Sequence, residues 1–425
     1  MITGTRGNVC KMLDENYYPP PQTDGGWRTG DPKALGVDVD MLNDAVNFHN
    51  NAVFTTSYGG ALVIIHKGHL ISESYVTGSE GGPRPWTPSM CNDMKSSAKS
   101  VFGTAVGVFL DEYKDSVTLD TDLVGKSRED SLIPQIWDQP LTDEKKKEIK
   151  VKHVLSMTSG HEGPEPWLAP SPRHHYPGYT GSHQMYEYCF GWWYYEGIPS
   201  HHTLWFNPGQ GFNYSSFGLE QFALAMRNIT GEMVGPWAYK RFLKQIGMPP
   251  GIRDNQFREV TYHSDRKLNF SYSPGWGAGG SFGCNAYGAD RSSSKYGYNT
   301  IVSSTFPCTA RDYARLGYLW LRKGRWNDQQ LVPADWIELA TSRYVRDNGE
   351  TPSNYGYTFW ILDDLEGVPK DAFGTRGNNQ NDSYVIPSLD LVVVRQGNDN
   401  GTVEERHKFQ HAVIQKIAAA FLEQS

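Results

Sequence analysis

Residues 94–101 are Met94-Lys95-Ser96-Ser97-Ala98-Lys99-Ser100-Val101, and they begin a stretch whose apolar residues have helical spacing. Ser96 and Lys99 lie three positions apart, which on a helix brings two side chains to one face. A serine hydroxyl is a weak nucleophile until a neighbouring base takes its proton. A lysine can be that base when burial disfavours its charged form. The stretch therefore predicts a nucleophilic serine at the start of a buried helix over residues 96–111.

The same Ser-x-x-Lys spacing occurs twice more in the chain, at Ser264/Lys267 and at Ser292/Lys295. Both of these pairs lie in polar, loop-like surroundings with no apolar helix after them. An isolated Ser-x-x-Lys is more often a capped, solvated helix start than a catalytic pair. The apolar helix that follows Ser96 therefore selects this serine over the other two.

A second polar motif, at Tyr214, precedes another helical stretch. Pro208-Gly209 leads into it, and the sequence Tyr214-Ser215-Ser216 is followed by a predicted helix from Leu219. A tyrosine fixed near a nucleophile can pass a proton between the serine and the leaving group. We expect Tyr214 to do so, although a lone tyrosine is more often a core residue. Tyr262-His263-Ser264 is a weaker candidate because it lacks both the lead-in and the helix.

The two ends of the chain contain the strand-like patterns, and the middle contains helical patches. Residues 61–65 and 70–76 flank Lys67-Gly68 and predict a hairpin. Further strands are predicted over residues 355–362, 383–387 and 391–395. We therefore expect one sheet built from both chain ends. The predicted parts are an N-terminal arm (1–34), a sheet domain (35–125 and 284–425) and an inserted helical and loop domain that roofs a cleft (126–283).

The composition is that of an ordinary globular protein, with 38% hydrophobic and 20% charged residues. A net charge of -7 without a basic cluster argues against nucleic-acid binding. No apolar stretch approaches the roughly 20 residues that span a bilayer. The first residues do not resemble a leader, which predicts a cytoplasmic protein unless a signal peptide was removed, in which case it is periplasmic or secreted. The oligomeric state stays open.

Cysteine and histidine patterns give no metal site. The five cysteines contain no Cys-x-x-Cys pair, and a single bridge from Cys284 to Cys308 remains open. His161-Glu162 does not continue into His-Glu-x-x-His. The adjacent pairs His174-His175 and His201-His202 are more typical of loop surfaces. The aromatic run over residues 190–195 fits either an apolar acyl pocket or packing between loops.

In their order, these motifs resemble the serine β-lactamase and penicillin-binding-protein-like family, specifically its branch of class C-like β-lactamases and esterases. Four further segments match over residues 35–422: Val151-Lys152-His153-Val154-Leu155-Ser156-Met157-Thr158-Ser159-Gly160, Ala278-Gly279-Gly280, residues 309–317 and residues 384–394. The resemblance implies an α+β fold, an α/β sandwich in which helices flank an antiparallel sheet and a mainly helical domain is inserted. It implies Ser96, Lys99 and Tyr214 as catalytic residues and no metal or organic cofactor.

The third family motif is where the chain departs from the pattern. The family has Lys-Thr-Gly or His-x-Gly on the strand beside the nucleophile, and here Thr375-Arg376-Gly377 stands in that place. Arg376 either supplies the missing charge for a substrate carboxylate or points to solvent. By resemblance, the oxyanion hole combines the N–H of Ser96 with one from this strand, at Asn378 or Asn379. Gly377 allows close approach of a ligand.

The expected function is an acyl-transfer serine hydrolase without a cofactor. Because the third motif lacks lysine, a carboxylesterase acting on small esters is expected first. An amidase, D-amino-acid peptidase or β-lactamase of the same fold is the first alternative, and an acyltransferase is the next. A catalytically inactive ligand-binding homologue is the alternative from another class.

Overall fold

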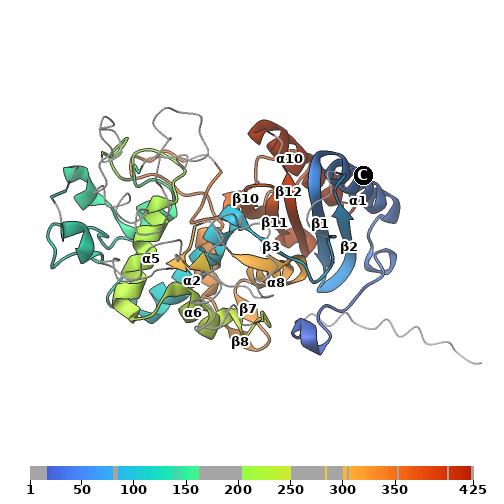
Figure 1. Cartoon of the computed structure of the whole chain (residues 1–425), viewed down its shortest axis with the longest axis horizontal. Helices are drawn as coiled ribbons and strands as arrows, with labels where there is room; N and C mark the ends of the chain where they lie inside the picture. The colour runs from blue at the N-terminus through green and yellow to red at the C-terminus, as the bar shows by residue number, and fades with distance from the viewer. Residues whose placement is uncertain are drawn as a thin grey trace, which may run out of the picture.

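The computed structural model describes residues 17–79, 85–138, 140–141, 143–161, 203–249, 283–284, 300–303, 306–351, 354–399 and 402–422. A six-stranded antiparallel sheet in the order β2-β1-β12-β11-β10-β9 forms its centre (Figure 1). The strands are β1 (Ser57–His66), β2 (His69–Thr77), β9 (Trp360–Ile361), β10 (Phe373–Gly377), β11 (Asn381–Ile386) and β12 (Leu391–Asp399). Together with the flanking helices, this sheet confirms the predicted α+β class.

Both ends of the chain contribute to this sheet, as the sequence pattern predicts. Strand β1, near the start of the chain, pairs with β12, near its end, with Val63 opposite Val394. The predicted hairpin joins β1 to β2 through Lys67 and Gly68, whose φ angles are 48° and 71°. Two positive φ angles in a two-residue turn match the right-handed twist of the strands.

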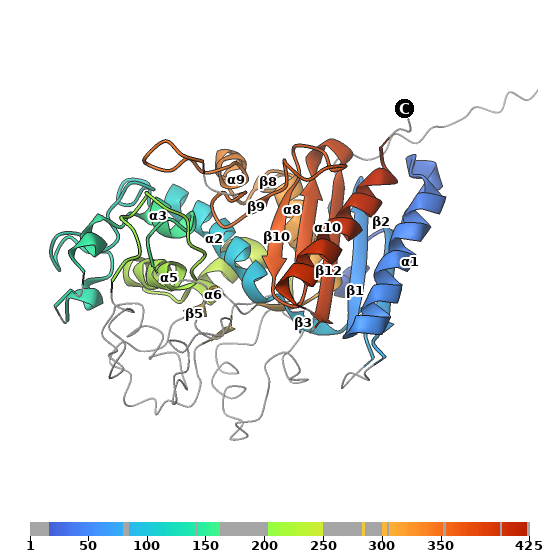
Figure 2. The ribbon, with the colours of Figure 1, turned by 90° about the horizontal axis from the view of Figure 1, so that it is seen from above.

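The two faces of the sheet are covered by different helices, which lie on opposite sides in Figure 2. Leu62 and Val393 belong to a core with α1 (Val39–Thr56) and α10 (Val403–Ala419). Their neighbours Val63 and Val394 face the other way and belong to a core with α8 (Ala310–Leu321). Successive strand residues point to opposite faces, so burial of both faces explains the nearly continuous apolar runs.

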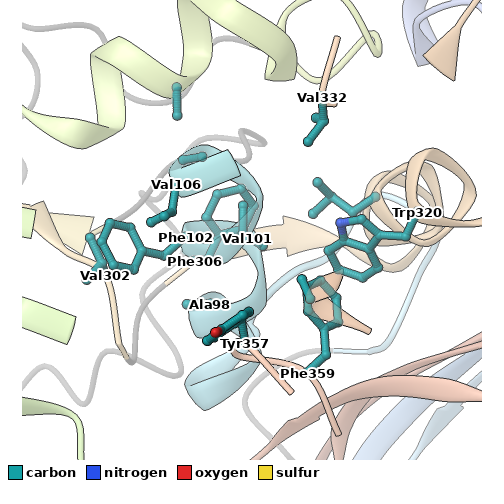
Figure 3. Close-up of a cluster of buried hydrophobic side chains, with 14 of the residues drawn as sticks. Ala98, Val101, Phe102, Val106, Val302, Phe306, Trp320, Val332, Tyr357 and Phe359 are labelled. Atoms are coloured by element: carbon teal, nitrogen blue, oxygen red, sulfur yellow. The ribbon is translucent and has the colours of Figure 1, made fainter. Parts of the chain in front are cut away.

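Helix α2 (Ala98–Glu112) lies between the sheet and the remaining helices, and each residue from Ala98 to Phe109 is buried. Figure 3 shows Phe102 beside Val302 and Phe306, with Trp320 and Phe359 on the other side. Burial on all sides places this mostly apolar helix inside the core. A Cβ at Gly103 would lie 1.9 Å from Thr358 Oγ1, so glycine is required for this close packing.

The other elements are shorter or lie around this core. The helices are α3 (Val151–Leu155), α5 (Phe217–Thr230), α6 (Val234–Ala238), α9 (Ala334–Ala340), the π-helix η8 (Tyr239–Leu243), and the 3-10 helices η1 (Gln22–Asp24), η2 (Lys33–Leu35), η3 (Lys95–Ser97), η4 (Pro134–Asp138), η5 (Glu144–Glu148) and η10 (Pro387–Leu389). The paired strands are β3 (Cys91–Asp93) with β6 (Pro307–Thr309), β4 (Gly283–Cys284) with β5 (Thr300–Ile301), and β7 (Arg325–Trp326) with β8 (Gln329–Gln330).

One predicted strand is much shorter than expected. The pattern over residues 355–362 predicts a continuous strand, but the structure contains only the two residues of β9. Asn354 and Thr358 have φ angles of 33° and 68°, which interrupt extended backbone. The segment instead folds back on itself through a bridge between Tyr355 and Trp360.

Candidate active site

The turn before Ser96 is held in an unusual backbone conformation. Lys95 has a φ of 52°, which is uncommon for a residue with a side chain. The carboxylate of Asp93 accepts the N–H of Lys95 at 3.2 Å and the N–H of Phe306 at 2.9 Å. Ser97 donates its hydroxyl to the carbonyl of Asn381 on β11 at 2.6 Å. These bonds fix the start of α2 against the sheet and leave Ser96 half-buried.

Lys99 lies one helical turn beyond Ser96, as the spacing predicts. Its Nζ is 3.1 Å from Ser96 Oγ and 2.6 Å from the carbonyl oxygen of Ser303, to which it donates. The lysine is 1% exposed. An unprotonated amine at this position can donate to Ser303 while its lone pair faces the Ser96 hydroxyl. The geometry therefore allows proton transfer from the serine to the lysine.

Tyr214 comes to this pair from a different part of the chain. The centroid of its ring lies 4.9 Å from Lys99 Nζ. Asn213 fixes the loop, donating its backbone N–H to the carbonyl of Met157 at 2.9 Å and its side-chain amide to the carbonyl of His161 at 2.7 Å. The segment 151–160, noted above for its family resemblance, thus hydrogen-bonds the loop that carries Tyr214 through Met157. The structure brings the three predicted catalytic side chains together.

Aromatic rings fix the orientation of Tyr214. Trp360 stacks on it with ring centroids 5.7 Å apart, and Tyr355 meets it edge-on at 6.1 Å. Such pairs restrict ring motion in addition to burying apolar area. Sequence reasoning missed both residues because it assigned them to a continuous strand. Aromatic residues repeated over 355–360 were the available signal.

The Thr375-Arg376-Gly377 triplet lies on β10, whose residues alternate between the faces of the sheet. Thr375 hydrogen-bonds Tyr313 of α8, and a Cβ at Gly377 would lie 2.1 Å from the carbonyl oxygen of Met94. Both therefore face the side of the sheet on which Ser96 lies. Arg376 faces α10, where its guanidinium meets His411 Nε2 at 2.9 Å. The arginine is thus half-buried and does not lie on the strand face occupied by Thr375.

The turn between β10 and β11 contains the predicted oxyanion donors. The N–H of Gly377 is directed at Asp382 Oδ1, 3.3 Å away. Burial raises the pKa of Asp382 to about 6. Asn378 is exposed, and Asn379 is half-buried with a φ of 61°. The oxyanion roles of Asn378 and Asn379 stay predictions.

A buried carboxylate near Lys99 was not singled out from the sequence. Glu220 on α5 is 0% exposed, and burial raises its pKa to about 7. Its carboxylate accepts the N–H groups of Val302 and Ser303 at 3.1 and 3.0 Å. A charged residue on the apolar side of the predicted helix was the available signal, because such residues are rarely buried without a partner.

Several other expectations concern single cysteines and histidines. Cys308 is a free, buried thiol, so the bridge to Cys284 is not formed. His161 is buried, and this burial lowers its pKa to about 3. Its ring contacts Ser159 and Gln221, which is a structural role. The described residues include no group of three potential metal ligands. Their helices are all too short or too polar to span a bilayer.

Some predicted features lie outside the described residues. They are Ser264/Lys267, Ser292/Lys295, Tyr262, Ala278-Gly279-Gly280, Glu162, His174-His175, His201-His202 and the aromatic run 190–195.

Comparison with known proteins agrees with the resemblance. The family model described as Beta-lactamase matches residues 54–415. Among solved structures, the simvastatin synthase of Aspergillus terreus superposes with a TM-score of 0.61 at 13% identity, covering 91% of this chain and 100% of that one. A penicillin-binding protein homologue from Caulobacter crescentus superposes with a TM-score of 0.59 at 15% identity, covering 90% of this chain and 98% of that one. A family VIII carboxylesterase superposes with a TM-score of 0.56 at 17% identity, covering 90% of this chain and 97% of that one.

Sequence similarity to curated proteins is more limited. An uncharacterised protein of Alkalihalophilus pseudofirmus is 32% identical over 106 residues, which are 23% of this chain and 31% of that relative. The family model, in contrast, spans most of the chain. The fold and the match over residues 54–415 define a member of the beta-lactamase family, whose members are serine hydrolases, and this chain belongs to that family.

Proposed function

We propose that the protein is a carboxylesterase that acts on small esters through an acyl-enzyme on Ser96. The observation that carries the proposal is the contact of Lys99 Nζ with Ser96 Oγ at 3.1 Å, beside the ring of Tyr214. A nucleophile within hydrogen-bond reach of an oriented base is the arrangement that activates a serine. Ser96 is half-buried, which is compatible with access by a substrate.

In the proposed acylation step, Ser96 Oγ bonds to the ester carbonyl carbon and its proton passes to Lys99 Nζ. The carbonyl oxygen becomes an oxyanion, for which we propose the N–H of Ser96 and one N–H of Asn378 or Asn379 as donors. Collapse of the intermediate breaks the bond to the alcohol oxygen. Tyr214 relays a proton from Lys99 to that oxygen, and the alcohol leaves.

Deacylation follows the same route in reverse with water. A water molecule gives a proton to the Tyr214–Lys99 pair as its oxygen bonds to the acyl carbon. The bond to Ser96 Oγ then breaks, and the serine recovers its proton while the carboxylic acid is released.

The third motif supports an ester rather than a β-lactam as substrate. Neither lysine nor histidine occupies the first position of Thr375-Arg376-Gly377, and the guanidinium of Arg376 contacts His411 and lies over Trp360. We therefore propose that Arg376 acts on substrate carboxylates only weakly. Gly377 differs from the expectation that it allows close approach of a ligand, because the carbonyl oxygen of Met94 occupies the space beside it.

A fluorophosphonate probe tests the nucleophile, and a substrate panel tests the class of bond. We expect one covalent adduct on Ser96, identified by peptide mass spectrometry and absent in Ser96→Ala. We expect p-nitrophenyl acetate and butyrate to be hydrolysed faster than nitrocefin or D-amino-acid anilides. An unlabelled but folded wild type would favour a ligand-binding homologue, and faster turnover of the anilides would favour an amidase.

A further inference from the structure

Glu220 is an unusual residue for its place in the fold. It lies on α5 among the buried side chains of Leu219, Phe222 and Ala223. A carboxylate away from water destabilises a protein unless hydrogen bonds or charges satisfy it. Burial raises the pKa of Glu220 to about 7, so that its ionised form is populated at the pH of an ordinary assay. A buried carboxylate that is so costly to the fold is expected to have a function that offsets this cost.

The partners of Glu220 lead directly to Lys99. The N–H groups of Val302 and Ser303, on one short segment, both donate to Glu220 Oε1. The carbonyl of that same Ser303 accepts the amine of Lys99 at 2.6 Å. The carboxylate thus holds the peptide that orients the lysine. Because Ser303 O and Ser96 Oγ are both within reach of Nζ, a shift of this peptide would move the amine relative to the serine.

The same helix also connects Glu220 with Tyr214. Glu220 lies six residues after Tyr214, on the helix that begins directly behind the tyrosine loop. The residues that Glu220 binds lie more than 80 positions further along the chain. One buried side chain therefore connects the part of the chain that carries Tyr214 with the segment that holds Lys99.

Charge adds to this geometric connection. The positive charge of Lys99 acts on Glu220 through space and favours the ionised carboxylate. The interaction is mutual, so the carboxylate favours a protonated Lys99. In the proposed mechanism the lysine becomes positively charged as Ser96 attacks, when the negative charge is most useful.

We propose that Glu220 is a positioning residue for the acyl-transfer reaction: it fixes the amine of Lys99 through the backbone of Val302 and Ser303 and stabilises its charge after proton uptake. This inference rests on the proposed function of Ser96 and Lys99. Glu220 acts through Lys99 and does not contact the substrate.

Two substitutions separate the hydrogen bonds from the charge. Glu220→Gln keeps an oxygen that can accept both N–H groups but carries no charge, and Glu220→Leu removes the acceptor as well. For a p-nitrophenyl ester, we expect kcat to fall about 10-fold in Glu220→Gln and about 100-fold in Glu220→Leu. We expect KM to change less than about threefold in both, since misplacing a base affects the chemical step more than binding.

Active-site titration with the fluorophosphonate and circular dichroism would establish the folded, reactive fraction of each variant. Asp312→Asn provides the matched control, because Asp312 is also buried and its pKa is also raised by burial, but it bonds Thr309 at the start of α8. We expect this control to lose thermal stability and to keep the wild-type kcat per titrated site.

A folded Glu220→Gln with kcat within twofold of wild type overturns the proposal. This measurement decides the question even if Glu220→Leu does not fold. Equal loss in the two variants and in Asp312→Asn would also overturn it, because the effect would then be a general one of stability. Failure of the proposed function is distinct: wild type would then show no label on Ser96.

Discussion

The two sides of the site are built differently. On the side of Ser96 and Lys99, buried polar groups bond one another and the surrounding backbone. On the side of the β10–β11 turn, Asn378 is exposed and Arg376 contacts α10. The difference indicates that the core fixes the groups proposed for the chemical step, whereas a more exposed turn is left for substrate recognition. Substitutions on the first side should therefore affect every substrate, and those on the second should affect only some.

The largest effect is expected for Lys99→Arg. An arginine stays protonated near neutral pH and cannot accept the proton of Ser96. We expect the acylation rate to fall about 10³-fold for all esters, within the range for loss of a general base. Stopped-flow measurement of the p-nitrophenol burst would test this. Near-native acylation in a folded variant would remove Lys99 from the mechanism.

Two buried carboxylates, one on each side of the site, predict a pH dependence of stability. Burial raises the pKa of Glu220 from its ordinary 4.5 to about 7 and the pKa of Asp382 from its ordinary 3.8 to about 6. A raised pKa means that the folded protein holds its proton where the unfolded chain has lost it. Each group therefore contributes stability that is complete below its unfolded pKa and is lost as pH rises through its folded pKa.

For each carboxylate this loss is on the order of 3 kcal/mol. We expect Glu220→Gln to lose less stability than wild type between pH 4.5 and 8, and Asp382→Asn to do so between pH 4 and 7. Urea midpoints at four pH values would measure both differences. Parallel curves for wild type and variant would show that the carboxylate titrates normally.

The second-largest effect on activity, after that of Lys99→Arg, is expected for Tyr214→Phe. The substitution keeps the stack on Trp360 but removes the hydroxyl that we propose as proton relay. We expect kcat to fall about 100-fold. The loss should be smaller for p-nitrophenyl esters than for alkyl esters, because p-nitrophenolate leaves without being protonated. Equal losses for both leaving groups would argue against protonation by Tyr214.

The smallest effect is expected for Arg376→Ala, on the other side of the site. We expect less than about twofold change for neutral esters and about fivefold weaker binding of esters with a carboxylate, the upper scale of one partly exposed charged contact. Steady-state kinetics on a matched neutral and anionic pair would measure the ratio. A large, equal loss on both would show that Arg376 instead stabilises the fold through His411.

Local sequence patterns were sufficient to predict those parts of the fold and the site that are determined by residues close together in the sequence. The Lys67-Gly68 turn, the sheet from both chain ends and the helical face shared by Ser96 and Lys99 could all be predicted. The role of Glu220 could not, because its partners are Val302 and Ser303 and their proximity exists only after folding. The orientation of Arg376 depends on the strand alternation of β10, which a motif match alone does not give.

The pairing of β1 with β12 has a consequence for synthesis of the protein. While the chain is being made, the β1–β2 hairpin has no partner for its inner edge until residues 391–399 emerge. Both faces of β1 are apolar, so the nascent chain presents an unpaired, aggregation-prone edge until those residues have been made. Removal of the last strand should therefore yield an aggregating fragment rather than a weakened hydrolase.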